Sequence, residues 1–550
     1  MKFSLNWSLI LLCLVSIIPL LDLFHPGLPI THDSQDHVAR IANFYQDLTE
    51  GIIIPRWAAN LNWGYGHPIL MFLYPLPSYI ASLFHFLGFT LVDAIKIVFG
   101  LTFILSGFTM YIWISSFLNK PAAMLSAALY MFAPYRFVDF YVRGAIGEHV
   151  AFVFPPLVFY FLFKLSRKAR WIYIVGGSLS LSLLILSHNA ITLMFLPLFF
   201  LYFTYLFYQS RIKKYFMFST SCLMLLGFGL SSFFWIPAFF EGKYTLRDIV
   251  TAGGYTLRFV NPKDFLYGPW SYGGTGEFTV QLGVVHLFAV IFAIFGAAVF
   301  LRNKSNLRIL IIGLSLYFFF TLYLMTEQAG FIWKHITTLQ KFQFPWRFLS
   351  VSVLLTSALG GIALFLIPKK FQQIVSVLIL SLILWFNKDY WHANGLLQKP
   401  ESFYTSIYNS TTDTGESSPI WSIRFMEHRP KKHIEVILGK AGIEEFSRIS
   451  TKHMYKITTD EKIRLRENTL YFPGWEVMVD GKNVPVEFQD PQNRGLMTFF
   501  VGKGEHDVNI VFRETKLRTL ANDISILSLF LLLTYGILRK RSLWQNFLSF

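Results

Sequence analysis

Long apolar runs follow one another along almost the whole chain, and they leave few folds open to it. A run of about 20 apolar residues can cross a bilayer as a helix. Only 15% of the residues are charged, whereas soluble domains have about 25%. The net charge of +16 lies mostly in links between the runs, where the positive-inside rule and anionic lipids account for it. The sequence therefore predicts a polytopic α-helical membrane protein that does not bind nucleic acid.

The basic links give the predicted helices a direction. If all of them face the cytoplasm together with Lys2, an even number of spans must separate each from the next. The apolar stretch 68–88 would break this rule, and its three prolines interrupt a regular helix, so we expect a re-entrant or interfacial segment there. About twelve spans result, with both termini cytoplasmic. The links are 119–120, 167–170, 211–214, 302–304, 369–370 and 539–541. The predicted spans are 7–23, 91–117, 121–135, 150–165, 171–187, 190–209, 215–239, 281–301, 307–325, 346–367, 371–387 and 521–538.

This topology divides the chain into a membrane domain, 1–387, a mainly β domain outside the membrane, 388–518, and a last helix with a cytoplasmic tail, 519–550. Within the β domain, Asp480-Gly481-Lys482-Asn483 between alternating apolar residues predicts a hairpin, and Gly502-Lys503-Gly504 a second turn. We expect a small β-sandwich that begins near residue 432. The predicted outer loops are 24–90, 136–149, 240–280 and 326–345.

The first outer loop holds Asp33, Asp36, His37 and Arg40 close together. As a helix start, this spacing places Asp36 and His37 on the face of Asp33, with Arg40 one turn further on. Such a cluster could deprotonate a hydroxyl or hold a divalent metal ion such as Mg²⁺ or Mn²⁺ at Asp33 and Asp36. The alternative is an ordinary helix entry with Asp33 as its N-cap.

Further candidates lie in the other outer segments. Arg143 and Arg347 have the forked guanidinium that binds phosphate. Arg143 and Glu148 could instead form a structural ion pair, and Arg347 could be an interfacial anchor beside Trp346. His188 could do no more than cap a helix. The cytoplasmic links contain little besides charge, so we expect the working face to be extracytoplasmic.

No nucleoside triphosphate drives reactions outside the cytoplasmic membrane, so an enzyme there needs a donor that is already energised. A sugar linked to a polyprenyl phosphate suits this place. Its transfer requires a carboxylate to deprotonate the acceptor and cations for the phosphate that leaves. Aromatic residues of the 68–88 segment, such as Phe72, Tyr74 and Tyr79, could line a groove for the lipid.

Motifs distributed along most of the chain carry a family resemblance. They are His32-Asp33-Ser34-Gln35-Asp36-His37, Gly64-Tyr65-Gly66-His67-Pro68, Tyr74-Pro75-Leu76-Pro77, Pro134-Tyr135-Arg136, Val142-Arg143-Gly144-Ala145 with Glu148, Ser187-His188-Asn189, Phe344-Pro345-Trp346-Arg347-Phe348, Tyr471-Phe472-Pro473-Gly474-Trp475 and Val479-Asp480-Gly481. With them the chain resembles the C-type (GT-C) membrane glycosyltransferases. More closely, it resembles the YfhO-like bacterial membrane proteins and the related pyruvoyl-tetrahydropterin-synthase-related membrane family.

The resemblance implies a GT-C-like fold and lipid-linked glycosyl transfer, with Asp33 as the first-loop acid and Glu148 as the second-loop acid. Asp36 would support Asp33 in catalysis. The donor and its phosphate would contact Arg143, Arg347, His37, His188 and Arg40. The first loop departs from the acid-x-acid pattern, which leaves the need for a metal open.

The sequence thus predicts a glycosyltransferase that uses a polyprenyl-phosphate sugar and acts on a glycan, glycolipid or other cell-envelope acceptor. One alternative is a transporter or flippase of lipid-linked saccharides, which should carry ionisable groups at mid-membrane and on both faces. A second alternative is a non-catalytic envelope assembly protein of the same fold.

Overall fold

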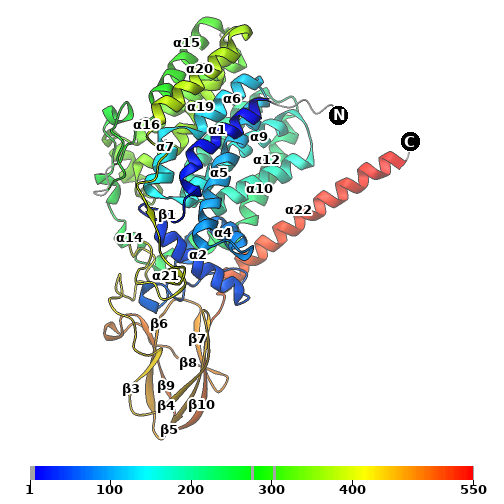
Figure 1. Cartoon of the computed structure of the whole chain (residues 1–550). Helices are drawn as coiled ribbons and strands as arrows, with labels where there is room; N and C mark the ends of the chain where they lie inside the picture. The colour runs from blue at the N-terminus through cyan, green and yellow to red at the C-terminus, as the bar shows by residue number, and fades with distance from the viewer. Residues whose placement is uncertain (1–6, 274–277, 302–304, 549–550) are drawn as a thin grey trace.

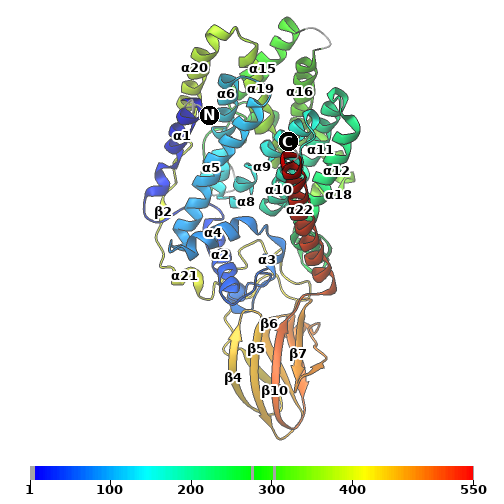
Figure 2. The same cartoon turned by 90° about the vertical axis from the view of Figure 1, so that its right-hand side faces the viewer.

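The computed structural model of the chain describes residues 7–273, 278–301 and 305–548. Lys2 and the basic link 302–304, on which part of the predicted topology rests, lie outside these residues. Most of the long helices form one bundle, while α22 (Lys516–Leu548) runs obliquely away from it (Figure 1). The strands of the C-terminal part gather at one end of the bundle (Figures 1 and 2). Between the bundle and these strands lie α2 (Ser34–Thr49), α4 (Leu76–Phe86) and α21 (Ser402–Thr405).

Each of the twelve predicted spans contains a helix. Among the described residues, seven helices are long and apolar enough to cross a membrane, or eight if one pair bent by 70° is a single span. The seven are α5 (Leu91–Ser115), α8 with α9 (Ile146–Ala151, Phe154–Arg167), α11 (Asn189–Gln209), α16 (Asn306–Leu324), η8 with α19 (Pro345–Phe348, Leu349–Leu366), α20 (Lys369–Asn387) and α22 (Lys516–Leu548). The bent pair is α12 (Lys213–Leu230) and α13 (Ser232–Phe240). Shorter apolar helices are α1 with η1 (Trp7–Ile17, Ile18–Phe24), α6 (Lys120–Met131), α10 (Trp171–Ser187) and α15 (Val284–Phe300).

Several basic links meet at a common end of the bundle. The Asn119 amide donates to Gln372 Oε1 over 2.5 Å, which joins the link before α6 to the first turn of α20. Ser210 Oγ donates to the Ser166 carbonyl over 2.9 Å, which joins the links that follow α11 and α9. These contacts fit an even number of crossings between the links. That this end faces the cytoplasm stays a prediction.

Helical turns fill most of the predicted outer loop 136–149. It is helical, with α7 (Pro134–Phe137), the π-helix η3 (Val138–Arg143) and then α8, and every residue in it is buried. Gly144 ends the π-helix with a φ of 67°, a conformation that costs glycine little. Inside the protein, Arg143 pairs with Asp139 and Glu148. Arg136 pairs with no described carboxylate, but it donates to Ser106 Oγ over 3.2 Å and lies 4.0 Å from the ring of Phe152.

The stretch after α20 is mostly irregular, and it wraps around the first-loop segment. Strand β2 (Leu396–Leu397) pairs with β1 (Leu28–Pro29), and the Tyr408 amide donates to the Asn60 carbonyl over 2.8 Å. The remaining short helices lie in the connecting segments. They are η2 (Asn62–Gly64), α3 (Ile69–Phe72), η4 (Gly242–Tyr244), α14 (Arg247–Val250), η5 (Gly254–Leu257), η6 (Pro262–Phe265), η7 (Glu327–Ala329), α17 (Gly330–His335), α18 (Thr337–Gln340) and η9 (Pro491–Asn493).

Two antiparallel sheets follow. One has the strand order β4-β5-β10-β7-β8 and the other β3-β6-β9. The buried Glu467 joins them, because its carboxylate on β6 accepts from Tyr455 Oη on β5 and from Arg448 Nη1 on β4, over 3.0 and 2.9 Å. The strands are β3 (Ile434–Leu438), β4 (Gly442–Ile449), β5 (Lys452–Thr459), β6 (Ile463–Leu470), β7 (Trp475–Val479), β8 (Lys482–Val484), β9 (Leu496–Val501) and β10 (Gly504–Phe512).

The two predicted turns have different outcomes. Asp480 and Gly481 both have positive φ, as a tight hairpin requires, and β7 pairs with β8 around them. Strands β9 and β10 also flank a turn at Gly502-Lys503, but they belong to different sheets. This second turn therefore carries the chain from one sheet to the other.

Candidate functional site

The start of α2 places Asp33 at the N-cap position but leaves its carboxylate free of capping. The Asp33 side chain accepts no hydrogen bond from the helix. Instead, Thr31 Oγ1 accepts a hydrogen bond from the amide of Ser34 in the first turn, over 3.1 Å. Asp33 is half-buried. Since the cap is supplied by Thr31, the carboxylate of Asp33 remains available to a ligand.

The backbone before α2 is joined to the buried segment 136–149. The amides of His32 and Asp33 donate to the carbonyls of Val142 and Arg143, each over 3.0 Å. Gly144 allows this approach, because a Cβ there would lie 2.1 Å from Thr31 Oγ1. The first-loop acid and the second predicted segment therefore form one rigid unit.

A buried cluster of charges surrounds Glu148, which has no exposed surface. Arg143 Nη1 lies 2.8 Å from Glu148 Oε2 and 2.7 Å from Asp139 Oδ1. Tyr135 Oη donates to Glu148 Oε1 over 2.5 Å, and Ser350 Oγ over 2.8 Å. Arg143 and Glu148 thus form the structural ion pair predicted as an alternative, and Asp139 is its third member.

Two aromatic–cation contacts extend this cluster toward η8. The guanidinium of Arg143 lies 4.7 Å from the ring of Trp346, and that of Arg347 lies 5.0 Å from the ring of Phe344. Arg347 Nη1 donates to the Phe342 carbonyl over 3.1 Å, while its buried Nε has no partner. No ion pair of Arg347 is found within the part of the chain that the structure describes. Its charge still acts on Glu148 and His188.

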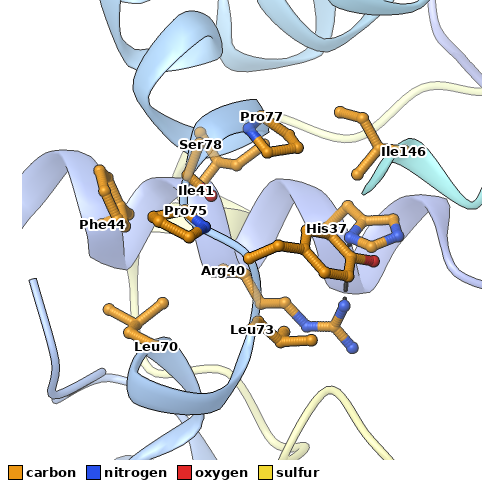
Figure 3. A pocket seen from close by; sticks show the side chains of 11 residues that line it. His37, Arg40, Ile41, Phe44, Leu70, Leu73, Pro75, Pro77, Ser78 and Ile146 are labelled. Carbon is orange, nitrogen blue, oxygen red and sulfur yellow. Dashed lines mark hydrogen bonds between the residues drawn. The ribbon is translucent and has the colours of Figure 1, made fainter. Parts of the chain in front are cut away.

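A second polar group, formed by Asp36, His37 and Arg40, lies on α2. His37 and Arg40 line a small cavity between α2 and the segment 70–78 (Figure 3). Arg40 Nη1 donates to His37 Nδ1 over 3.1 Å, and Arg40 Nε to Thr412 Oγ1 over 2.9 Å. Tyr408 Oη donates to Asp36 over 3.2 Å. The stretch after α20 therefore closes the side of α2 that faces away from the bundle.

Burial shifts the acid–base properties of this group. It raises the pKa of Asp36, although the nearby Arg40 acts in the opposite direction. It also lowers the pKa of His37 well below its usual value, and the charges of Arg40 and Arg143 add to this effect. His37 Nε2 is buried and has no partner in the structure. His37 is therefore a neutral imidazole at pH 7 with one ring nitrogen free.

Tyr74 lies between the two groups. Its ring stacks on that of His188, with centroids 4.8 Å apart, and lies against Gly147, where a Cβ would be 2.0 Å from it. Burial raises the pKa of Tyr74 to about 12, and the charges of Arg40, Asp33, Arg347 and Arg143 all act on its phenol. His188 also caps α11, since its Nδ1 accepts from the amide of Ile191. The break between α3 and α4 therefore contributes to the site.

The structure brings all the predicted site residues into one neighbourhood, and their roles stay predictions. Sequence reasoning missed Asp139, Ser350, Tyr408 and Thr412. Asp139 lies in the predicted second loop and precedes Arg143 by one helical turn, so its spacing was a usable signal. The other three come from distant segments and had no local signal.

A metal ion would find few ligands here. Within the described ranges, no group of three or more histidine, cysteine or acidic side chains could hold one. Asp33 and Asp36 offer two carboxylates, of which that of Asp36 is engaged by Tyr408. Since Mg²⁺ is often held by only one or two carboxylates together with a substrate phosphate, the metal site at Asp33 and Asp36 stays a prediction.

A family model described as "6-pyruvoyl-tetrahydropterin synthase related domain; membrane protein" matches residues 70–391. A curated relative is an uncharacterized protein of Lactococcus lactis subsp. cremoris (strain MG1363), 27% identical over 230 residues. The match covers 39% of this chain and 36% of that protein, so the chain spans little more than a third of its relative.

Two solved structures are similar to part of this chain. The arabinofuranosyltransferase AftD from mycobacteria has a TM-score of 0.47 and 13% identity, over 73% of this chain and 28% of that one. The oligosaccharyltransferase of Archaeoglobus fulgidus, in a complex with zinc and sulfate, has a TM-score of 0.40 and 13% identity, over 74% and 58%. At these scores neither likeness assigns an activity to this chain.

Proposed function

The chain belongs to the 6-pyruvoyl-tetrahydropterin synthase related family of membrane proteins, and we propose that it is a membrane glycosyltransferase. It transfers a sugar from a polyprenyl-phosphate-linked donor to an extracytoplasmic glycan, glycolipid or other cell-envelope acceptor. The observation that carries this proposal is the uncapped, half-buried carboxylate of Asp33, whose backbone is bonded to that of Arg143 in the buried charged cluster. This juxtaposition pairs a base with cations, as glycosyl transfer from a phosphate requires.

In the proposed reaction, Asp33 accepts the proton of the acceptor hydroxyl. The acceptor oxygen forms a bond to the anomeric carbon, while the bond from that carbon to the phosphate oxygen breaks. The polyprenyl phosphate leaves with the electron pair of the broken bond. Asp36, half-buried one turn away, places a second carboxyl group beside Asp33.

The cations have different tasks in this scheme. Arg347 is the better donor-phosphate ligand, since its Nε is unpartnered and its guanidinium pairs with no described carboxylate. Arg143 is already held by Glu148 and Asp139, so it sets the local field and orients Glu148. His188 and His37 lie within the same neighbourhood as neutral donors, and Arg40 anchors His37.

The test follows transfer from labelled polyprenyl-phosphate sugars in membranes that contain the protein or its Asp33→Asn variant. Asparagine keeps the size of the side chain but cannot accept the proton, so we expect transfer to fall by about 10²–10⁴-fold. Asp93→Asn is the matched control. It also removes a carboxylate from a helix start, but Asp93 is paired with Lys96 at 2.8 Å and lies outside the site.

Loss in Asp33→Asn alone supports the proposal. Equal transfer by the parent and Asp33→Asn overturns Asp33 as the base. If the parent transfers no sugar from any of several donors, the glycosyltransferase proposal is wrong. The remaining alternatives are then transport of lipid-linked saccharides and envelope assembly.

A further inference from the structure

An apolar groove of about 450 Å³ opens between three helices of the bundle. Val158 and Leu162 of α9, Leu196 and Phe203 of α11, and Met224 of α12 form its walls. Among the described residues that line it, none is charged, and only Thr220 and Ser221 are polar. This volume is within the range of pockets that hold a small ligand.

The walls of the groove are fixed by aromatic packing. Phe199 lies 4.9 Å from the ring of Phe159, and Phe203 stacks on Phe216 at 5.1 Å. The rim, in contrast, faces outward, with Phe200 exposed to 68% and Leu225 to 74%. A groove on such a membrane-facing surface can be entered sideways by a lipid chain.

Two of these helices begin at the candidate site. Glu148 lies ten residues before Val158, and His188 caps α11 eight residues before Leu196. At a helical rise of 1.5 Å per residue, the groove therefore starts about 12–15 Å along α9 and α11 from the polar cluster. The helices α9 and α11 pack against each other. The cluster and the groove therefore occupy successive positions along the same pair of helices.

We propose that this groove holds the polyprenyl chain of the donor, whose phosphate is bound at Arg347 and His188. The inference rests on the proposed function for the identity of the lipid. A single groove suits a molecule with one long chain, and its uncharged lining suits a hydrocarbon. Arg347 of η8 acts electrostatically on His188 at the start of α11, which suits a phosphate at this end of the groove.

The experiment uses the full chain in nanodiscs and a long-chain polyprenyl phosphate with a diazirine in the middle of its chain. Farnesyl phosphate serves as the short-chain competitor, and phosphatidylglycerol as the competitor with two acyl chains. Leu225→Trp narrows the groove. Because Leu225 is exposed, this variant should fold. Leu316→Trp, at a position exposed to 66% on α16, is the matched control.

We expect crosslinks to map to α9, α11 and α12. Leu225→Trp should weaken the binding of the long-chain polyprenyl phosphate by about tenfold, or roughly 1.4 kcal/mol. The same variant should bind farnesyl phosphate as tightly as the parent does. Leu316→Trp should bind like the parent. Crosslinks elsewhere, an equal effect on both chain lengths, or equal competition by phosphatidylglycerol would overturn the proposal.

These outcomes are separate from those of the transfer assay. If the groove is labelled but no sugar is transferred, the proposal of a polyprenyl site stands and the proposal of a glycosyltransferase is wrong. If sugar is transferred but the groove is not labelled, the proposal of a glycosyltransferase stands and the proposal of this lipid site is wrong.

Discussion

The backbone amide of Asp33 donates to the carbonyl oxygen of Arg143 over 3.0 Å. This bond joins the backbone of a half-buried acid to that of an arginine whose guanidinium is held by two buried acids. Because the backbone junction sets where both side chains start, small changes there should have large effects.

Gly144→Ala should disrupt the junction. A Cβ at this position would lie 2.1 Å from Thr31 Oγ1, and the φ of 67° is strained for alanine. A displacement of Asp33 by about 1 Å should cost about a hundredfold in transfer. The control is Gly88→Ala, which also has a positive φ but no heavy atom within 4 Å. It should lose only ~1–2 kcal/mol of stability and keep its transfer rate. Equal transfer by the two variants would show that the close approach does not matter.

Glu148→Gln should destabilise the protein strongly, because it breaks the buried ion pair with Arg143 and replaces the carboxylate that accepts from Tyr135 and Ser350. Breaking a buried ion pair in this way costs about 3–5 kcal/mol. Ser350→Ala removes only one hydrogen bond to the same carboxylate and should cost about 1 kcal/mol. Thermal unfolding in nanodiscs measures both. A similar shift for both variants would mean that the charge of Glu148 contributes little to stability.

His37 should make the protein sensitive to mild acid. Its pKa in the folded protein is lowered, chiefly by burial, so below about pH 6.5 the unfolded chain takes up a proton that the folded one resists. Stability is lost as the pH falls, by up to ~1.4 kcal/mol per pH unit. His37→Asn should lose less stability than the parent between pH 6.5 and 5. The control is His32→Asn, at an exposed imidazole. The same slope for parent and His37→Asn would contradict the prediction.

Glu467 should stabilise the β-strand region at neutral pH and lose this effect only in stronger acid than His37 responds to. Burial alone would raise its pKa, but His453 and Arg448 outweigh burial and lower it to about 2. The carboxylate therefore contributes stability above its unfolded pKa of about 4.3, and this contribution is lost as the pH falls toward 2. The stability difference between parent and Glu467→Gln should be largest near pH 7 and shrink below pH 4. A difference that does not change with pH would show that packing, not charge, is responsible.

The sequence predicted features that depend on neighbours along the chain. Apolar runs must satisfy their backbone hydrogen bonds internally in a membrane, which explains why each predicted span contains a helix. The Asp480-Gly481 turn formed as predicted because both residues tolerate positive φ. The helix that starts at Asp33 was equally local, since its spacing alone placed the acids, His37 and Arg40 on neighbouring turns.

Only the tertiary structure decided which partner each polar group has. Thr31, rather than Asp33, caps α2, because the chain approaches Gly144 there. Tyr408 and Thr412 reach Asp36 and Arg40 from more than 370 residues away, and no local pattern encodes that contact. The predicted outer loop 136–149 is buried, and only the structure shows that Arg143 pairs with Asp139 and Glu148 while Arg136 packs on the ring of Phe152. The sequence by itself determined where helices and turns form, because those depend on local backbone preferences. Packing decided which charges are paired and which carboxylate is left free, because burial makes an unpaired charge costly.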